Sequence, residues 1–175
     1  MTLISMIYAT SQDNVLGLKN SIPWHVKGEQ ERFKAVTNNK LVVVGRQTYE
    51  ILPCSLPLKD IIVLSSNPLK DTNVRRVSSL EEAIQIAQHE GRLELVIAGG
   101  AKLFEQAIDI CHVIYKSTVL VNAIGDVFGP KIPTSRYKLV WVKNIKESPS
   151  YSYQTFVVKE LENKKITPDF GLLIL

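Results

Sequence analysis

Residues 95–108 read Leu-Val-Ile-Ala-Gly-Gly-Ala-Lys-Leu-Phe-Glu-Gln-Ala-Ile, and this stretch decides the fold. Its first four residues form an apolar run with the length and composition of a buried strand. After the two glycines, Leu103, Phe104 and Ala107 recur with the spacing of one face of a helix. A buried strand that leads through a glycine turn into an amphipathic helix is typical of a parallel α/β sheet.

The same alternation of strand and helix extends in both directions from this stretch. Short apolar runs that favour strands occur at Leu3–Ala9, Leu41–Val44, Ile61–Leu64, Leu95–Ala98, Val113–Val121, Leu139–Val142 and Thr155–Val158, with a further candidate at Val74–Val77. Helices are predicted over 80–87, over 103–108 and from about Gly28 to Thr37. The fold class is therefore α/β, with a mainly parallel central sheet of about eight strands, an antiparallel C-terminal hairpin and about four flanking helices.

The predicted helix over 80–87 carries signals at both ends. Ser79 is followed three residues later by Glu82, which is the pattern of a capping box. Gly91 comes just after the last apolar position and is typical of a helix end. We therefore expect this helix to begin at the Ser79 cap and to close at Gly91.

The composition is that of a soluble globular protein. The chain has 175 residues, 45% of them hydrophobic and 22% charged, which excludes a disordered or collagen-like protein. No apolar stretch approaches the roughly 18 residues that a membrane span needs. Cys54 and Cys111 are too few for a disulfide framework and are compatible with a reduced cytoplasm. We expect a cytoplasmic protein with one domain over residues 1–160, followed by a tail over 161–175 that is not an independent domain.

Small and cationic residues follow three of the predicted strands, as Gly45-Arg46-Gln47-Thr48, Ser65-Ser66-Asn67 and Gly99-Gly100-Ala101-Lys102. In an open α/β sheet these positions lie at the carboxyl edge, where ligands bind. Glycines admit the backbone close to a phosphate, and Arg46 or Lys102 supplies positive charge, so the three junctions favour a phosphorylated nucleotide. Each junction taken alone is also typical of an ordinary loop.

The kind of nucleotide follows from what these junctions contain. The chain has no G-x-G-x-x-G motif, and no acidic residue ends a strand where it could hold a ribose hydroxyl, which argues against a Rossmann site. Cations and serines instead favour a 2′-phosphate, and hence NADP over NAD.

An acidic residue near the start of the first predicted helix is the candidate for proton chemistry. Glu29 and Phe33 lie four residues apart and so share a helix face. If that face lines the sheet, the carboxyl group lies among Phe33, Ile7 and other apolar groups, and its pKa is expected to rise. Such a group can hydrogen-bond to a nitrogen heterocycle or protonate it. The alternative is that Glu29 only complements the helix dipole.

Several short motifs occur in a fixed order along the chain: Gly17, Ile22-Pro23-Trp24, Glu29 with Phe33, Val44-Gly45-Arg46-Gln47-Thr48-Tyr49-Glu50, Leu64-Ser65-Ser66, Ile97-Ala98-Gly99-Gly100-Ala101, Gly125-Asp126 and Tyr151-Ser152-Tyr153. In type, order and spacing they resemble the dihydrofolate reductase family, from about Leu3 to Glu160. Two further stretches, Lys27–Gln30 and Tyr151–Gln154, are most similar to the transferable, trimethoprim-resistant bacterial members.

The resemblance implies an NADPH-dependent oxidoreductase that reduces 7,8-dihydrofolate to tetrahydrofolate, by hydride transfer from nicotinamide C4 to pterin C6. It gives catalytic roles to Glu29, Trp24 and Ser117, with Glu29 accepting hydrogen bonds from the pterin N3–H and 2-amino group while a proton reaches N5 through water. It also implies support of one-carbon metabolism and thymidylate synthesis, antifolate inhibitors as further ligands, and a monomer without nucleic-acid or membrane partners.

The resemblance also implies the residues that contact each ligand. Substrate contacts are implied for Ile7, Tyr8, Glu29, Gln30, Phe33, Leu52, Leu56, Lys59, Ala98, Phe104 and Ser117. Cofactor contacts are implied for Ala9, Leu16, Gly17, Ser21, Gly45, Arg46, Gln47, Thr48, Leu64, Ser65, Ser66, Gly99, Gly100, Ala101, Lys102 and Leu103. A cis peptide between Gly99 and Gly100 and a lid loop over residues 16–24 belong to the same family pattern.

Several positions depart from that pattern. Lys59 stands where the family usually has an arginine that grips the substrate's α-carboxylate, and a lysine cannot make that two-pronged contact. Phe104 replaces a tyrosine, Ala101 replaces the last glycine of a triplet, and Ala98-Gly99 stands where the family has Gly-Gly. Gln30, beside the acid, is expected to weaken trimethoprim binding while sparing the substrate, because specificity is a difference between two affinities.

Two other functions remain open from the sequence. The pyrimidine reductase of riboflavin synthesis shares this fold and NADPH use, although the pairing of Glu29 with Phe33 argues against it. A non-catalytic basic protein that binds RNA or a nucleotide is suggested only by the net charge of +4. A metal site is not expected, because the three histidines are scattered and no H-E-x-x-H or C-x-x-C motif is present.

Overall fold

The computed structural model of the chain describes all residues except 20, 53–59, 72 and 162–175. The predictions that concern Cys54, Leu56, Lys59 and the C-terminal tail therefore fall outside the described residues. Within the described part of the chain, no helix is long and apolar enough to span a membrane.

The core of the fold is an eight-stranded sheet with the strand order β5-β4-β3-β6-β1-β7-β10-β9. Neighbouring strands from β5 to β7 pair in parallel, and β10 and β9 are added in antiparallel fashion. The strands are β1 (Leu3–Ser11), β3 (Leu41–Gly45), β4 (Ile61–Leu64), β5 (Arg75–Val77), β6 (Glu94–Ile97), β7 (Val113–Val119), β9 (Tyr137–Ile145) and β10 (Tyr151–Val158). The predicted mainly parallel sheet with an antiparallel C-terminal hairpin is confirmed.

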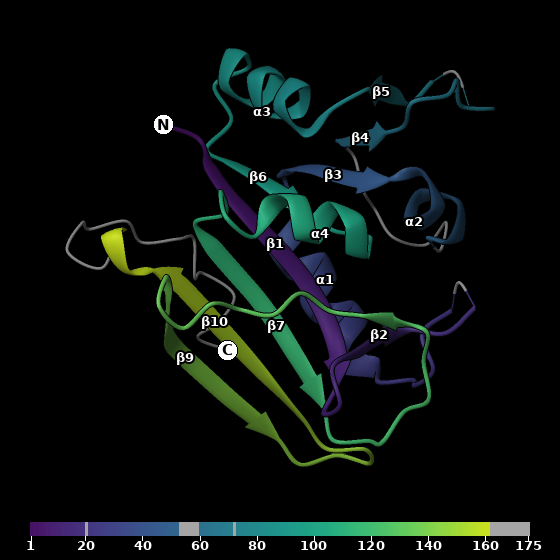
Figure 1. Ribbon diagram of the computed structural model, residues 1–175, viewed down its shortest axis with the longest axis vertical. Helices are drawn as coiled ribbons and strands as arrows, with labels where there is room; N and C mark the ends of the chain where they lie inside the picture. The colour runs from purple at the N-terminus through teal and green to yellow at the C-terminus, as the bar shows by residue number, and fades with distance from the viewer. Residues whose placement is uncertain (20, 53–59, 72, 162–175) are drawn as a thin grey trace.

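Helices cover both faces of this sheet (Figure 1). They are α1 (Lys27–Thr37), α2 (Arg46–Ile51), α3 (Leu80–His89) and α4 (Ala101–Ala107), with a short 3-10 helix η1 (Lys159–Leu161) after the last strand. The apolar side chains of α3 and α4 pack with one face of the sheet, and those of α1 pack with the other. The sheet is therefore buried on both faces, as the near-continuous apolar runs of its parallel strands require.

Besides η1, three short elements were not among the predicted ones. These are α2 and the two strands of a small second sheet, β2 (Val15–Gly17) and β8 (Val127–Phe128). With six, three and two residues, they are too short to show a periodicity in the sequence. In the main sheet, β9 and β10 both extend beyond the predicted runs, because their added residues are largely polar or partly exposed.

The predicted ends of α3 are confirmed. The Ser79 hydroxyl accepts a hydrogen bond from the backbone N–H of Glu82 at 3.1 Å. The Glu82 carboxylate accepts from Ser78, one residue before the expected partner. Gly91 has a φ of 64°, and the N–H groups of Gly91 and Arg92 bond to the carbonyls of Gln88 and Ala87, which is a Schellman ending.

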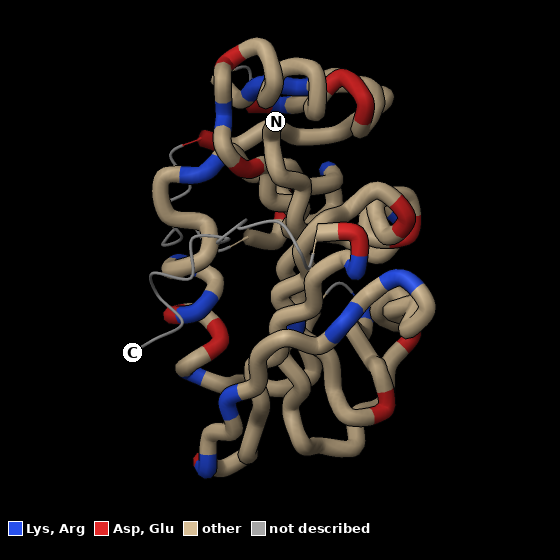
Figure 2. The backbone as a smooth tube through the Cα atoms, turned by 90° about the vertical axis from the view of Figure 1, so that its left-hand side faces the viewer, with Lys and Arg blue, Asp and Glu red and all other residues tan. Residues whose placement is uncertain are grey.

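Basic residues are interleaved with acidic ones along the backbone (Figure 2). At one end of the sheet, Arg75 and Arg92 each form ion pairs with both Asp60 and Glu90. The four side chains neutralise one another, so these arginines do not form a basic patch.

A second ion pair is largely buried near the amino ends of the strands. Lys40 Nζ lies 2.6 Å from Glu94 Oε2, with side-chain exposures of 14% and 6%. The other oxygen of Glu94 accepts hydrogen bonds from Ser5 at 2.5 Å and Tyr115 at 3.4 Å. The carboxylate therefore depends on Lys40 for the compensation of its charge.

We predict that Lys40→Met destabilises the protein by about 3 kcal/mol, because removal of one partner leaves a buried charge uncompensated. The free energy of unfolding in urea measures this loss. The double variant Lys40→Met/Glu94→Gln is expected to recover part of it. Glu160→Gln, which breaks the exposed contact with Arg136 at 3.9 Å, serves as the control and should change little. An equal loss of unfolding free energy in Lys40→Met and Glu160→Gln would contradict the role assigned to Lys40.

Candidate active site

The predicted strand-to-helix junctions meet at the carboxyl edge of the parallel strands. Gly45 is the last residue of β3 and the N-cap of α2, whereas Gly100 follows β6 and is the N-cap of α4. The Gly45 N–H donates to the carbonyl of Gly99 over 2.7 Å, so the two junctions are in direct contact. The sheet thus brings together two of the three stretches that the sequence singled out.

The backbone at Gly99 and Gly100 is packed too closely for larger residues. Gly99 has a φ of 121°, and the peptide bond to Gly100 is cis, as the resemblance implied. A Cβ atom at Gly100 would lie 3.1 Å from the Thr48 hydroxyl oxygen, and one at Gly99 would lie 3.3 Å from the Thr48 side chain. These contacts leave a narrow backbone surface beside Thr48, which suits close approach of a phosphate.

Cationic side chains lie around this edge, although some of them are already engaged. Arg46 Nε is 2.8 Å from Glu50 Oε1, one helical turn along α2. The Ser65 hydroxyl donates to the Asn67 carbonyl and accepts from its N–H, so it belongs to the turn after β4. Ser66, Gln47 and Lys102 are exposed.

Sequence analysis missed Arg76 at this edge. Its guanidinium donates to the Ser65 carbonyl at 2.8 Å, because the parallel register of β4 and β5 places Arg76 opposite Val63. The two residues are eleven positions apart, and only the strand pairing brings them together. This cation therefore adds to the positive charge near the Ser65–Ser66 junction.

The acidic residue lies on α1, at the opposite face of the sheet from α4. Glu29 is partly buried, and the burial raises the pKa of its carboxyl group above the ordinary value. A hydrogen bond from Ser117 on β7 and the charge of Arg32 lower this pKa in part. No described residue donates a hydrogen bond to Glu29 Oε1, which is nonetheless buried. The carboxyl group therefore has an acceptor atom available for a ligand.

Four of the apolar residues expected around the substrate fall into one cluster. Ile7 packs with Phe33, Leu52 and Ala98 on the α1 face of the sheet. On the neighbouring strands, Ala9 of β1 pairs in register with Ser117 of β7, which acts on Glu29. The cluster on β1 and β7 therefore lies near Glu29. A partly buried acid thus lies beside an apolar surface, which is the combination needed to bind a flat heterocycle with one polar edge.

Other expected contact residues lie on the opposite face. The rings of Tyr8 and Phe104 are 5.1 Å apart, in the cluster that α3 and α4 cover. The expected cofactor residues Leu16, Leu64 and Leu103 belong to this cluster as well. The structure therefore separates the side chains of Tyr8 and Phe104 from Glu29.

The segment expected to form a lid is attached to the small second sheet. Gly17 lies in β2, its carbonyl accepts from the N–H of Asp126, and the N–H of Lys19 donates to the Asp126 carboxylate. Ser21 is exposed and bridges to Leu18. Trp24, expected to be catalytic, packs with Val26, Val119 and Tyr151 in a third apolar cluster.

The start of α1 is held against β10 by a close contact. The Tyr153 hydroxyl donates to the Gly28 carbonyl at 2.6 Å. A Cβ atom at Gly28 would lie 2.1 Å from the Tyr151 hydroxyl oxygen, so a larger residue there would require the tyrosine or the helix start to shift. The contact fixes the height of Glu29 above the sheet.

A parallel sheet with glycine-rich, cationic junctions at its carboxyl edge and a partly buried acid on α1 is the combination expected of a nicotinamide-dependent reductase. The dihydrofolate reductase family model matches residues 3–160. The chain therefore belongs to the dihydrofolate reductase family. Its activity is that of the family, the reduction of dihydrofolate with NADPH. This finding leaves no support for the pyrimidine reductase or the non-catalytic binding protein.

Individual relatives give the same result. The dihydrofolate reductase of Buchnera aphidicola subsp. Baizongia pistaciae is 34% identical, with 94% of this chain and 99% of that protein aligned. Dihydrofolate reductase type 15 of Escherichia coli is 33% identical, with 86% and 96% aligned. The two identities are nearly equal, so they do not place this chain closer to the numbered types, such as type 15, than to the Buchnera enzyme.

A solved structure supports the fold and the cofactor. Dihydrofolate reductase from Enterococcus faecalis, complexed with NADP(H) and RAB-propyl, is 28% identical with a TM-score of 0.81. The match covers 90% of this chain and 96% of that one. The glycine junctions beside Thr48 and the nearby cations of this chain fit the same cofactor.

We predict that Arg46→Met raises the KM for NADPH about tenfold, since it removes a charge-assisted contact to phosphate. The KM for NADH, which lacks the 2′-phosphate, should stay nearly unchanged. Steady-state kinetics with both cofactors measures the preference. Arg75→Met is the matched control, because its guanidinium is paired with Asp60 and Glu90 instead. A parallel rise for both cofactors would place Arg46 elsewhere than at the 2′-phosphate.

Proposed function

We propose that Glu29 binds the pterin ring of 7,8-dihydrofolate and promotes its protonation while NADPH reduces it to 5,6,7,8-tetrahydrofolate. The observation that carries this proposal is the buried Oε1 of Glu29, to which no described residue donates. A pterin offers two donors, N3–H and the 2-amino group, side by side, and one carboxylate can accept from both. NADPH, when bound, supplies the hydride.

The surrounding residues position the ring and exclude water. Ile7, Phe33 and Leu52 provide an apolar surface on the α1 face, against which the ring can lie flat. Ser117 helps to lower the pKa of the carboxyl group, and Oε1 has no described donor and can accept from the ligand. An apolar, water-poor site strengthens the attraction between the carboxylate and a protonated pterin, and restricts the approach of the reacting atoms.

The pH dependence of the reaction is expected to follow this acid. Because burial raises the pKa of Glu29, the site retains a proton at higher pH than an exposed glutamate would. Reduction consumes one proton, so kcat/KM for dihydrofolate should fall as pH rises through this pKa. We predict that Glu29→Gln lowers kcat/KM by about 100-fold or more and removes this pH-dependent fall.

The assay is NADPH oxidation with and without dihydrofolate over a series of pH values, with methotrexate as an inhibitor. Glu31→Gln is the matched control, because it removes an exposed carboxylate from the same helix. Its profile should match that of the unchanged protein. Turnover in Glu29→Gln at the original rate and with the original pH profile would contradict the proposed role.

We further infer that trimethoprim inhibits this enzyme weakly. The support is the resemblance of Lys27–Gln30 to the trimethoprim-resistant members, together with the position of Gln30 next to the acid on α1. Gln30 is exposed, so it can alter contacts with an inhibitor without disturbing the apolar cluster at Phe33. Discrimination then arises from contacts that the inhibitor makes and the substrate does not.

We predict micromolar or weaker inhibition by trimethoprim. Titration of both trimethoprim and methotrexate against the same enzyme preparation tests this, with methotrexate showing that the active site is intact. Nanomolar inhibition by trimethoprim would contradict the inference.

We infer that the enzyme acts as a monomer in the cytoplasm, where its product supports one-carbon metabolism and thymidylate synthesis. Cys111 is a free, buried cysteine, which is compatible with a reducing compartment. Its thiol is fully buried and donates to backbone carbonyls, and burial raises its pKa to about 12, so it does not depend on oxidation.

A further inference from the structure

A buried arginine lies one helical turn after the acid and was not among the predicted site residues. Arg32 is on α1, and only 6% of its surface is exposed. Arginine is almost never buried without partners. Because Arg32 lies one turn after the functional acid, the partners of its guanidinium bear on the chemistry of Glu29.

The guanidinium is held by two strands of the sheet. Its Nη1 donates to the Lys116 carbonyl at 2.8 Å and to the Ser117 hydroxyl oxygen at 3.0 Å, and its Nη2 donates to the Gln154 carbonyl at 3.2 Å. Its central carbon lies 4.4 Å from the centre of the Tyr153 ring. Contacts to β7 and β10 from one planar group leave it a single orientation.

The bond to Ser117 determines where the serine proton points. A hydroxyl group has one hydrogen to donate and two lone pairs. Arg32 occupies one lone pair of the Ser117 oxygen, because a guanidinium can only donate. The hydrogen of Ser117 is then available to point toward Glu29, whose pKa Ser117 helps to lower. A hydrogen bond between Ser117 and Glu29 would therefore run from the serine to the acid, with Arg32 behind the serine.

The charge of Arg32 acts in the same direction. Burial lowers the pKa of its guanidinium to about 10, which leaves it positive at neutral pH. Among the described residues, Tyr151 and Tyr153 on β10 also interact with Glu29, and burial raises the pKa of both, so they stay neutral. Arg32 supplies positive charge that compensates a negative charge on Glu29.

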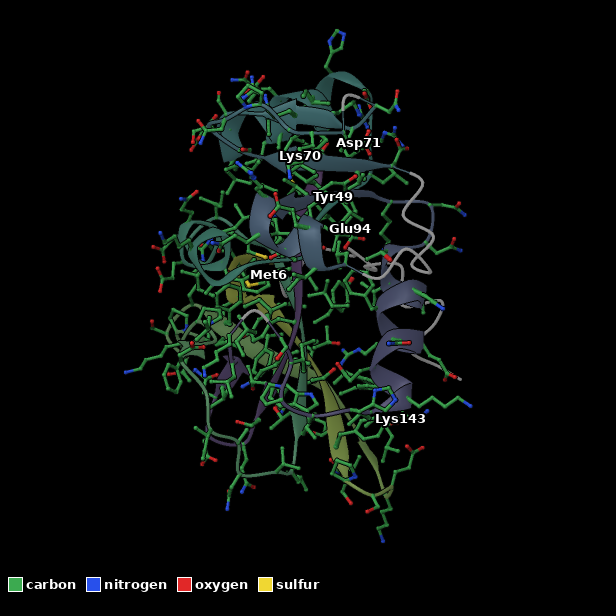
Figure 3. The ribbon with its side chains drawn as sticks, turned by 90° about the vertical axis from the view of Figure 1, so that its right-hand side faces the viewer. Met6, Tyr49, Lys70, Asp71, Glu94 and Lys143 are labelled. Atoms are coloured by element: carbon green, nitrogen blue, oxygen red, sulfur yellow. The ribbon has the colours of Figure 1, made fainter. Side chains whose placement is uncertain are left out.

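Arg32 also separates the acid from an outer cavity. A cavity of about 470 Å³ lies between α1 and the β9–β10 hairpin, and Arg32, Trp141 and Tyr153 are among its lining residues. Lys143 reaches it from β9, close to α1 (Figure 3). Glu29 and Ser117 do not line it. A short replacement of Arg32 would connect this cavity with the acid, so a test needs a long side chain.

We propose that Arg32 is a positioning residue that orients the Ser117 hydroxyl toward Glu29 and favours the ionised form of this acid in the enzyme. The proposal rests on the proposed role of Glu29 and adds a residue that controls it. The proposal assigns an effect on the pH range of catalysis to a buried side chain whose guanidinium bonds to β7 and β10.

The variant Arg32→Met retains a long, unbranched side chain, two atoms shorter than that of arginine, and removes both the charge and the donors. Without them the carboxylate loses a compensating charge, and the apparent pKa of Glu29 should rise by about one unit or more. The fall of kcat/KM with pH should then move to higher pH by the same amount. Arg32→Lys keeps the charge but not the planar fork, so a smaller shift of the same sign is expected.

The shift is measured in two ways. The pH profile of single-turnover NADPH oxidation reports it during catalysis. Infrared titration of the carboxyl group, with Glu29→Gln in the same background as the reference, reports it in the protein without ligands. The second measurement needs no turnover, so an inactive enzyme would contradict the proposed function without affecting the test of Arg32.

Controls separate this role from a structural one. Lys34→Met removes an exposed positive charge from the same helix and should leave both titrations unchanged. In a Ser117→Ala background, Arg32→Met should produce a smaller shift than in the original protein, because the hydrogen-bonded link is already broken. An unshifted titration in folded Arg32→Met overturns the proposal. If that variant does not fold, an unshifted titration in Arg32→Lys does so.

Discussion

A carboxyl group held out of water is the constraint on which this structure depends. Glu29 must be desolvated to bind a heterocycle tightly, yet a desolvated carboxylate is costly unless donors and positive charge compensate it. Ser117 and Arg32 supply both, from the strand β7 and from the helix that bears the acid itself. The packing of α1 on the sheet is therefore a requirement of the chemistry as well as of the core.

Most of the fold could be predicted from the sequence, because the signals for it are local. Buried parallel strands appear as unbroken apolar runs. The ends of α3 are each encoded by a single residue: Ser79 accepts a hydrogen bond from a backbone N–H of the first turn, and Gly91 adopts a positive φ at the other end. The glycine junctions after β3 and β6 were also predictable, because strand order in a parallel sheet brings carboxyl ends to one edge. Glu29 could be found because its helix face is shared with Phe33.

The parts that could not be predicted depend on contacts between distant residues. Arg76 reaches Ser65 through the register of two strands, and Arg32 reaches Ser117 across 85 positions of the chain. Nothing in the residues around Arg32 distinguishes it from an exposed arginine on the polar side of a helix. The resemblance to known reductases did not reveal it either, since the motifs that carry the resemblance do not include this position.

The contact between Gly28 and the tyrosines of β10 positions the start of α1. Glu29 is the next residue, so a larger residue at position 28 would displace either the tyrosine hydroxyls or the helix start that carries the acid. The position of Glu29 thus depends on a residue on the β10 side of the helix. A binding defect caused at position 28 would therefore appear in kinetics as a fault of the acid.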